Sequence, residues 1–232
     1  MNIAENLARI NDEIRRAEAQ YQRPVNSVGL IAVSKKKPAS DIEAAAAAGQ
    51  RDFGENYCQE AVDKIQEISN PGLTWHFIGP IQSNKTRLIA EHFDWVHTVD
   101  RSKIARRLHE ARPTDKPPLN ICIQINISGE PSKSGIHPEQ AADFLRAMQD
   151  FDRLRVRGLM ALPAPAADME QQRQPFARVQ ECLEQLRQID PGLDTLSMGT
   201  TQDMQAAIAE GATLVRIGTA IFGERDASEG AC

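Results

Sequence analysis

Apolar residues recur with two different spacings along this chain, and the alternation between the two spacings predicts its secondary structure. Over residues 1–22 the apolar side chains recur three or four positions apart, which predicts an amphipathic N-terminal helix. From residue 28 onward, short apolar or β-branched runs, typical of buried strands, alternate with stretches of helical spacing. The predicted strands are 28–33, 52–54, 75–79, 94–99, 119–127, 154–162, 193–198 and 213–218.

Helices are predicted between these strands, at 38–48, 56–68, 84–92, 101–111, 138–149, 175–189 and 201–209. In the first of them, Ser40 and Glu43 have the spacing of a capping box, and Gly49 follows as a stop signal. The strand-and-helix pattern repeats about eight times, as in a closed (β/α)8 barrel of roughly 250 residues. We therefore expect one α/β domain over 1–232, a TIM barrel with an extra N-terminal helix and a flexible tail at 225–232. A doubly wound open sheet, which usually has fewer strands, is the alternative.

Composition and charge exclude several classes of protein. The chain carries 27 Lys and Arg against 32 Asp and Glu, a formal net charge of −5, whereas a general nucleic-acid coat needs a positive excess. No apolar run approaches about 18 residues, so no membrane span is predicted, and the N-terminus lacks the features of a signal peptide. The cysteines are scattered and the histidines show no metal-ligand spacing. We therefore expect a cytoplasmic protein with reduced thiols and no metal site.

Function in a barrel of this type resides on the loops that follow the strands. The loops after the last two strands carry glycines and hydroxyl side chains at Ser197, Gly199, Thr200, Thr201, Gly218 and Thr219. Glycine lets the backbone approach an anion, hydroxyls add donors and helix N-termini converge there, which together indicate a phosphate site. Thr200 also has the spacing of a helix cap with Asp203, which is an alternative role for it. Neither G-x-x-x-x-G-K-[ST] nor G-x-G-x-x-G occurs in the chain.

Lys35 is the other candidate for chemistry, because it follows an unbroken apolar strand with only Ser34 between them. A partly desolvated lysine has a lowered pKa and can attack a carbonyl carbon as an amine. Position alone favours the alternative that Lys35, Lys36 and Lys37 form a solvated basic turn, in which Lys37 is a further candidate amine. An amine and a phosphate site across one barrel mouth suit a cofactor that carries both an aldehyde and a phosphate. Pyridoxal 5′-phosphate (PLP) is the obvious cofactor of this kind.

Long motifs along the whole chain resemble the YggS/PROSC family of pyridoxal phosphate homeostasis proteins. They lie at 32–35, 37–38, 53–57, 75–85, 124–127, 132–135, 157–160, 196–199 and 215–223. The resemblance implies a single barrel similar to the N-terminal domain of alanine racemase, with PLP held as a Schiff base on Lys35. It also implies cofactor-binding roles for Asn56, His76, Met160, Ser197, Gly199, Thr200, Arg216, Gly218 and Thr219.

Within that set, the resemblance assigns different residues to different parts of PLP. The phosphate is expected to contact Ser197, Gly199, Gly218 and Thr219, with Thr200 or Thr201 as a further donor. The ring is expected to be lined by Asn56, His76 and Met160. Arg216 is expected to approach the pyridine nitrogen, and the phosphate is its alternative partner. The chain departs from the usual family motifs at Thr200-Thr201 and at Lys36, which leaves the additional hydroxyl and amine contacts open.

The resemblance implies a carrier that binds PLP reversibly, buffers it inside the cell and passes it to apo-enzymes in transient contacts. A racemase needs acid/base groups on both faces of the substrate carbon, and the only tyrosines here are Tyr21 and Tyr57. We therefore expect a monomer with no catalytic residue and no nucleic-acid or membrane partner. A weak PLP-dependent amino-acid racemase is the alternative, and the negative charge disfavours a regulator that binds RNA. Lys133 is a further candidate amine for transfer.

Overall fold

The computed structural model describes residues 2–68, 70–129 and 134–224. Within these ranges, parallel strands close into a barrel in which each strand pairs with the next one along the chain and β8 pairs with β1. The strands are β1 (Gly29–Val33), β2 (Asp52–Glu55), β3 (Thr74–Phe77), β4 (Trp95–Val99), β5 (Leu119–Ile125), β6 (Leu154–Ala161), β7 (Thr195–Ser197) and β8 (Leu214–Ile217). The predicted TIM barrel is therefore confirmed, and the alternative of an open sheet is wrong.

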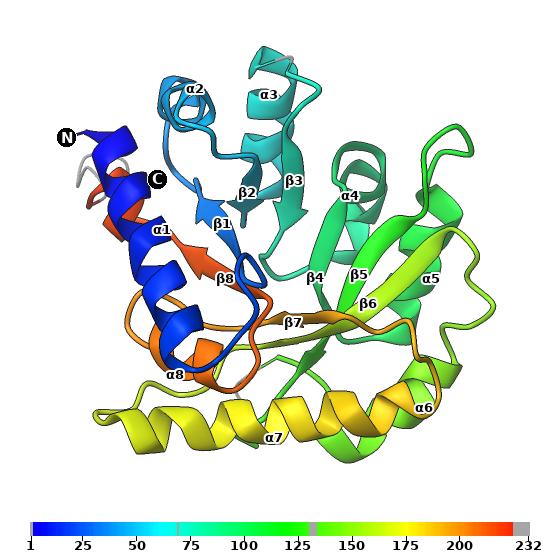
Figure 1. The fold of residues 1–232 in the computed structure, drawn as a ribbon. Helices are drawn as coiled ribbons and strands as arrows, with labels where there is room; N and C mark the ends of the chain where they lie inside the picture. Colours follow the sequence, from blue (N-terminus) through cyan, green and yellow to red (C-terminus); the bar gives the residue numbers. More distant parts are fainter. Residues whose placement is uncertain (1, 69, 130–133, 225–232) are drawn as a thin grey trace.

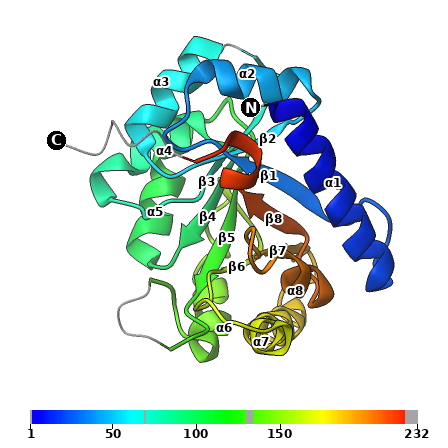
Figure 2. The same cartoon turned by 90° about the vertical axis from the view of Figure 1, so that its left-hand side faces the viewer.

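Helices connect the strands and surround the barrel, as two perpendicular views show (Figure 1, Figure 2). They are α1 (Ile3–Gln20), α2 (Ala39–Ala47), α3 (Cys58–Ile68), α4 (Thr86–His92), α5 (Ser102–Ala111), α6 (Ala141–Arg146), α7 (Met169–Arg187), α8 (Met204–Ala209) and α9 (Thr219–Phe222). Short 3₁₀ turns at Ser83–Lys85 and Pro138–Gln140 lead into α4 and α6. None of the helices in the described part of the chain has the length and apolar character that crossing a membrane requires.

The barrel strands point alternate side chains outward to the helices and inward to the barrel axis. The outward set is largely apolar and buried, and includes Phe53, Phe77, Ile123 and Leu196. The inward set contains buried polar side chains at His76, His97, Ser197 and Arg216. Branched apolar side chains normally fill the interior of a (β/α)8 barrel. Because buried polar groups must find hydrogen-bond partners, the polar interior of this barrel requires its own network.

The N-terminal helix α1 packs beside α8 and α9 and so joins the start of the chain to its last repeat. The apolar face predicted from its spacing is buried at Leu7 and Ile14. The Asn6 side-chain amide donates to the Ile221 carbonyl of α9 at 2.9 Å. Because α9 begins at Thr219, directly after β8, this contact holds the loop that carries one of the predicted phosphate-binding residues.

The start of α2 differs from the prediction, whereas its end agrees. The predicted capping box of Ser40 and Glu43 is wrong, because Pro38 is the N-cap and no side chain caps the helix. Proline fixes its own φ and presets the helix start without a capping side chain. The stop signal is confirmed at Gly49, whose φ of +99° lies in the left-handed region that favours glycine.

The boundaries of the last helices also differ from the prediction. α7 begins before the predicted 175, because the Asp168 carboxylate accepts a hydrogen bond from the Gln171 amide at 2.8 Å and caps its first turn. α8 begins after the predicted 201, since the residues before it form a turn. α9 has no counterpart among the predicted helices. The predicted tail at 225–232 lies outside the described residues.

Candidate functional site

The end of β1 and the loop after β8 meet at one side of the barrel mouth. Lys35 and Lys37 line a cavity of about 30 Å³ together with Gly218 and Thr219. The structure therefore brings the predicted amine beside two residues that were expected to bind phosphate. The Lys37 ammonium donates to the Glu224 carbonyl at 2.8 Å, so this second candidate amine is engaged with the backbone.

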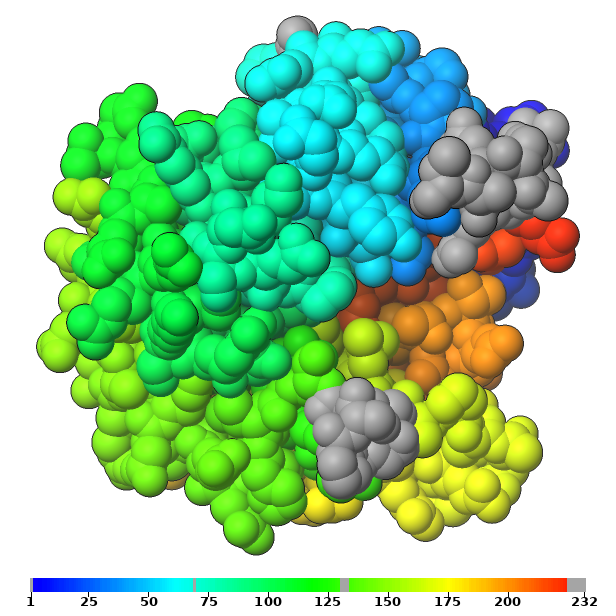
Figure 3. All heavy atoms as spheres, turned by 180° about the vertical axis from the view of Figure 1, so that it is seen from behind, coloured from blue at the N-terminus to red at the C-terminus, as the bar shows by residue number. Residues whose placement is uncertain are grey.

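Segments from the first and last thirds of the chain share one surface. Seen from behind, the brown-red and orange segments around β7 and β8 lie close to the cyan segment of α3 (Figure 3). The large apolar or aromatic side chains of Tyr57, after β2, and Leu162, after β6, are exposed. The barrel mouth is thus formed by loops that are distant in sequence.

A buried ion-pair network supports the turn after β1. It consists of Ser34, Glu55, Glu60 and Lys64, and we refer to it as the turn network. Glu55 Oε1 accepts hydrogen bonds from Ser34 Oγ at 2.7 Å and from Lys64 Nζ at 2.9 Å. Lys64 Nζ also donates to the Ser34 carbonyl at 2.9 Å and to Glu60 at 2.5 Å. Burial raises the pKa of the Glu55 carboxyl, and the Lys64 ammonium partly opposes that rise.

The turn network anchors both neighbours of Lys35. Ser34 precedes it, and on the other side Glu60 accepts the backbone N–H of Lys36 at 2.6 Å. Lys36 has a φ of +58°, in the left-handed region, and its ammonium lies 5.9 Å from the centre of the Tyr57 ring. Lys36 does not line the cavity that its two lysine neighbours share. The middle lysine is thereby directed away from the candidate site.

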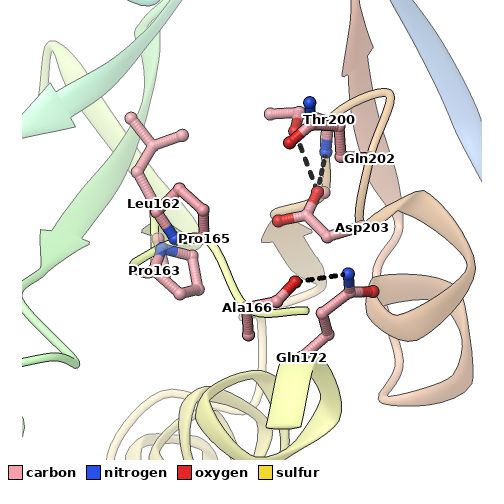
Figure 4. A pocket seen from close by; sticks show the side chains of 10 residues that line it. Leu162, Pro163, Pro165, Ala166, Gln172, Thr200, Gln202 and Asp203 are labelled. Atoms are coloured by element: carbon pink, nitrogen blue, oxygen red, sulfur yellow. Dashed lines mark hydrogen bonds between the residues drawn. The ribbon is translucent and has the colours of Figure 1, made fainter. Parts of the chain in front are cut away.

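The loop after β7 lines a second cavity, of about 100 Å³, opposite the prolines that follow β6 (Figure 4). Gly199 has a φ of +98°, and a Cβ atom there would lie 2.6 Å from the Ala207 Cβ, so glycine is required. Thr200 donates to Asp203 Oδ1 from its backbone N–H at 2.6 Å and from its hydroxyl at 2.9 Å. The alternative role of Thr200 as a helix cap is wrong, because Asp203 is the N-cap of α8 and no side-chain hydrogen bond caps that helix. Thr200 instead contacts Asp203 within the turn before α8. Thr201 is exposed and does not line this cavity.

A third cavity, of about 450 Å³, lies at the ends of β2, β5 and β6, and the described residues that line it are uncharged. Its polar lining consists of Asn56, Thr98, Gln124, Asn126 and Ser134. Asn56 Oδ1 is buried and has no hydrogen-bond partner among the described residues. An unmet buried acceptor costs about 1–3 kcal/mol, so a donor on a ligand would relieve that cost. Gly79 permits this packing, because a Cβ atom there would lie 2.1 Å from the Asn56 carbonyl oxygen.

Three of the predicted site residues lie in the barrel interior rather than on the loops of the mouth. His76, Met160 and Ser197 are each at most 1% exposed. His76 Nε2 lies 3.0 Å from Asp52 Oδ1, and His76 Nδ1 lies 2.9 Å from His97 Nε2. The other ring nitrogen of His97, Nδ1, lies 2.7 Å from Ser197 Oγ. Sequence reasoning missed His97, because its inward position on β4 is the only signal that it offers.

Arg216 projects from β8 into this interior and is 5% exposed. It donates to Ser197 Oγ at 2.7 Å and to a backbone carbonyl of β6 at 3.1 Å. Burial lowers the pKa of Arg216 to about 10, although Asp203 acts in the opposite direction, so the guanidinium stays charged at neutral pH. The pKa of His97 is held well below its usual 6.5, mainly by burial of the ring and to a smaller extent by the nearby His76 and Arg216. The His97 ring is therefore neutral where Arg216 is charged.

Comparison with known proteins defines the class first. The chain matches the family model of the alanine racemase N-terminal domain over residues 6–226. Alanine racemase of Corynebacterium glutamicum superposes with a TM-score of 0.72 at 18% identity, over 98% of this chain and 62% of that one. At that identity the likeness concerns the fold alone. The fold thus defines a barrel of the racemase N-terminal class.

Nearer relatives define the family. The pyridoxal phosphate homeostasis protein of Pseudomonas aeruginosa is 57% identical over 97% of this chain and 96% of its own. Its namesake in Escherichia coli K12 is 53% identical over 98% and 99%. The structure of PipY of Synechococcus elongatus with PLP bound is 39% identical, with a TM-score of 0.81 over 95% of this chain and all of that one. The chain belongs to the family of pyridoxal phosphate homeostasis proteins, as its motifs predict.

Proposed function

We propose that this protein binds PLP reversibly on Lys35 and serves intracellular PLP homeostasis by buffering and supplying the cofactor. The observation that carries the proposal is the cavity shared by Lys35, Gly218 and Thr219. An amine at this place can bond an aldehyde carbon, while a hydroxyl and backbone N–H groups face a phosphate. The names of the relatives and the PLP-bound structure of PipY support the same ligand.

The residues at the mouth fit PLP in chemistry. PLP supplies an aldehyde carbon for attachment to an amine and a phosphate for anchoring. Gly218 packs so closely against β1 that a Cβ atom would lie 3.2 Å from the Val33 carbonyl oxygen. Its backbone is therefore bare at the cavity that Lys35 lines. Asn56 adds a buried oxygen without a partner, at the edge of a cavity large enough for a small ligand.

We assign the phosphate to the loops after β7 and β8, through Gly199, Thr200, Gly218 and Thr219, with Ser197 contributing through its interior bonds to His97 and Arg216. We assign the pyridine ring to Asn56, Met160 and Arg216, with His76 contributing from the barrel interior through its bonds to Asp52 and His97. Gly218 and Thr219 support the anchor most directly, because they border Lys35. For Thr200 to contact a phosphate, its two donors must leave Asp203.

Carriage rather than turnover is the function that the described residues favour. Racemisation needs an acid/base group on each face of the substrate carbon. Tyr21 is the C-cap of α1, on the outside of the barrel, and Tyr57 is 48% exposed beside Lys36. A charged Arg216 facing the ring nitrogen disfavours protonation of that nitrogen, which weakens the ring as an acceptor of electrons.

We further propose that residues 1–232 form one PLP-binding domain, which acts as a monomer in the cytoplasm without nucleic-acid or membrane partners. Apo-enzymes that need PLP would meet it in transient contacts. Lys37 stays a candidate second amine, and Lys133, the other candidate, lies outside the described residues.

Borohydride trapping tests the assignment of Lys35. Reduction of the PLP-loaded protein, followed by peptide mass mapping, should give one phosphopyridoxyl adduct, on Lys35. Lys35→Ala should abolish this adduct, whereas the matched control Lys36→Ala should keep it, because Lys36 does not line the shared cavity. An adduct found mainly on another lysine contradicts the assignment.

A long incubation with amino acids of one enantiomer separates carriage from racemisation. We expect PLP-loaded protein to leave L-alanine and L-serine optically pure over hours, as followed by chiral chromatography. Racemisation that disappears in Lys35→Ala would show that the protein is a PLP-dependent racemase instead.

A further inference from the structure

Polar side chains form a continuous hydrogen-bond chain across the barrel interior. Its members are Asp52 on β2, His76 on β3, His97 on β4, Ser197 on β7 and Arg216 on β8, and we refer to it as the interior chain. The successive distances are 3.0, 2.9, 2.7 and 2.7 Å. Its three middle members are at most 1% exposed, whereas the Asp52 side chain is 41% exposed. The interior chain therefore joins a half-exposed carboxylate to a buried guanidinium.

The two ends of the interior chain, with neutral imidazole rings between them, set the direction of every bond in it. A guanidinium can only donate and a carboxylate can only accept. Arg216 therefore donates to Ser197, and His76 donates from Nε2 to Asp52. A neutral imidazole that donates from Nε2 accepts at Nδ1, so His97 donates from Nε2 to His76 and accepts the Ser197 hydroxyl proton at Nδ1. With both rings neutral, all four bonds point from Arg216 toward Asp52, and each ring is the Nε2–H tautomer.

This direction leaves Arg216 oriented but not neutralised. Its two acceptors, the Ser197 hydroxyl and a β6 carbonyl, are uncharged. A guanidinium presents five N–H donors in a rigid fork, so two such bonds fix its plane and leave donors for a ligand. A carboxylate in direct contact would instead neutralise the charge and occupy the fork. The aligned bonds also polarise Ser197, which makes its oxygen a better acceptor for Arg216.

We infer that Asp52, His76, His97 and Ser197 are positioning residues that hold Arg216 in the orientation in which it meets the pyridine nitrogen of PLP. The inference rests on the proposed function for the identity of the ligand. It deepens that function by giving roles to Asp52 and His97. It also makes His76 and Ser197 act through Arg216.

Nuclear magnetic resonance of the ligand-free protein tests the interior chain without PLP. In ¹⁵N-labelled protein at pH 7, His76 and His97 should be neutral and protonated on Nε2. The guanidinium N–H signals of Arg216 should shift or broaden in Ser197→Ala. The Arg216 signals should stay unchanged in the control variant Thr195→Val. The Thr195 hydroxyl lies on the same face of β7 as Ser197, but it donates to Asp194 and not to the interior chain. The inference would be overturned if either histidine ring were protonated on Nδ1. It would also be overturned if the Arg216 signals were the same in Ser197→Ala as in the wild type.

The rate of PLP release, measured by transfer to an excess of an apo-enzyme, tests the effect on the ligand. Loss of one buried hydrogen bond to a charged group corresponds to a factor of about ten or more, so Ser197→Ala should release PLP about tenfold faster. The double variant Ser197→Ala with Arg216→Ala should release PLP no faster than the single variant Arg216→Ala, because Ser197 acts only through Arg216. His97→Asn, which keeps an acceptor for Ser197, should retain PLP longer than His97→Phe. Additive effects of Ser197 and Arg216 would overturn the inference.

Failure of the inference and failure of the proposed function give different results. If the wild-type protein does not bind PLP, the proposed function is wrong, and the ring tautomers and Arg216 signals of the ligand-free protein still decide whether the interior chain exists. If PLP is trapped on Lys35 but the release rates are additive, the function stands and the inference is wrong. Ser197→Ala removes a single oxygen atom, so it provides the test even if His97→Phe does not fold.

Discussion

The turn network and the interior chain both support the barrel mouth, and they differ in where their charges lie. In the turn network, Lys64 lies between Glu55 and Glu60, so opposite charges are in direct contact. In the interior chain, neutral side chains separate the Asp52 carboxylate from the Arg216 guanidinium. Direct ion pairs immobilise the backbone on both sides of Lys35. Neutral links orient a cation and leave its charge available to a ligand.

This difference has consequences for stability. A buried charge that loses its partner costs about 3–5 kcal/mol, because it cannot be solvated by water. A buried neutral group that loses its hydrogen bond costs about 1–3 kcal/mol. We therefore expect damage to the turn network to destabilise the fold more than damage to the middle of the interior chain.

Lys64→Met should have the largest effect. It leaves the fully buried Glu55 carboxylate without its cation, so the free energy of unfolding in urea at pH 7 should fall by about 3–5 kcal/mol. Ser197→Ala should cost about 1–3 kcal/mol in the same measurement. The double variant of Lys64→Met with Glu55→Gln should recover part of the loss, since the uncompensated charge is then gone. Equal losses for Lys64→Met and Ser197→Ala would remove the contrast between the two assemblies.

The pH dependence of stability should differ in sign between the two assemblies. Burial raises the folded-state pKa of Glu55 above its usual 4.5, so the stability tied to this carboxyl is present below that pH and is lost as pH rises through the folded-state pKa. Burial lowers the folded-state pKa of His97 below 6.5. The stability tied to this ring is therefore present above pH 6.5 and is lost as pH falls toward the folded-state pKa.

Unfolding curves from pH 4 to pH 8 should reveal both contributions. Relative to the wild type, Glu55→Gln should lose less stability as pH rises above about 4.5, and His97→Phe should lose less as pH falls below about 6.5. If both variants changed the same limb of the curve, the opposite electrostatics assigned to the two assemblies would be wrong.

The smallest effect is expected at Lys36. Its left-handed backbone costs an L-residue about 1–2 kcal/mol, which glycine avoids. Loss of the exposed contact with Tyr57 removes about 0.5 kcal/mol. Lys36→Gly should thus stabilise the protein by about 0.5–1.5 kcal/mol in thermal unfolding. Lys37→Gly is the matched control and should destabilise it, since the backbone of Lys37 is not left-handed. A loss of stability in Lys36→Gly would mean that the Tyr57 contact outweighs the backbone strain.

Much of the fold was predictable because strand and helix periods are local properties. Each predicted strand has a counterpart in the barrel, and the face of α1 predicted to be apolar is buried at Leu7 and Ile14. The early start of α7 was not predicted, because Asp168 caps it from within a proline-rich segment that reads as a linker. α9 was missed because a four-residue helix has too few residues to show a period.

The candidate site was predictable only in part. Lys35 follows β1 and Thr219 follows β8, so the sequence predicts that both lie at the same end of the barrel. In the structure they line one cavity. The contact of His97 with Ser197 joins residues 100 positions apart, and neither residue carries a motif that names the other. The direction of His76 was not predictable from β3 alone, because only the closed barrel shows that it faces Asp52 and His97.

By itself, the sequence determined the barrel class, the order of its elements and the family, because periodicity and motifs are written in consecutive residues. Only the tertiary structure decided which polar side chains face one another inside the barrel and how Lys35 is held between anchored neighbours. The reason is closure. When β8 pairs with β1, the inward positions of distant strands are brought within hydrogen-bond distance, and burial then obliges each polar group among them to find a partner.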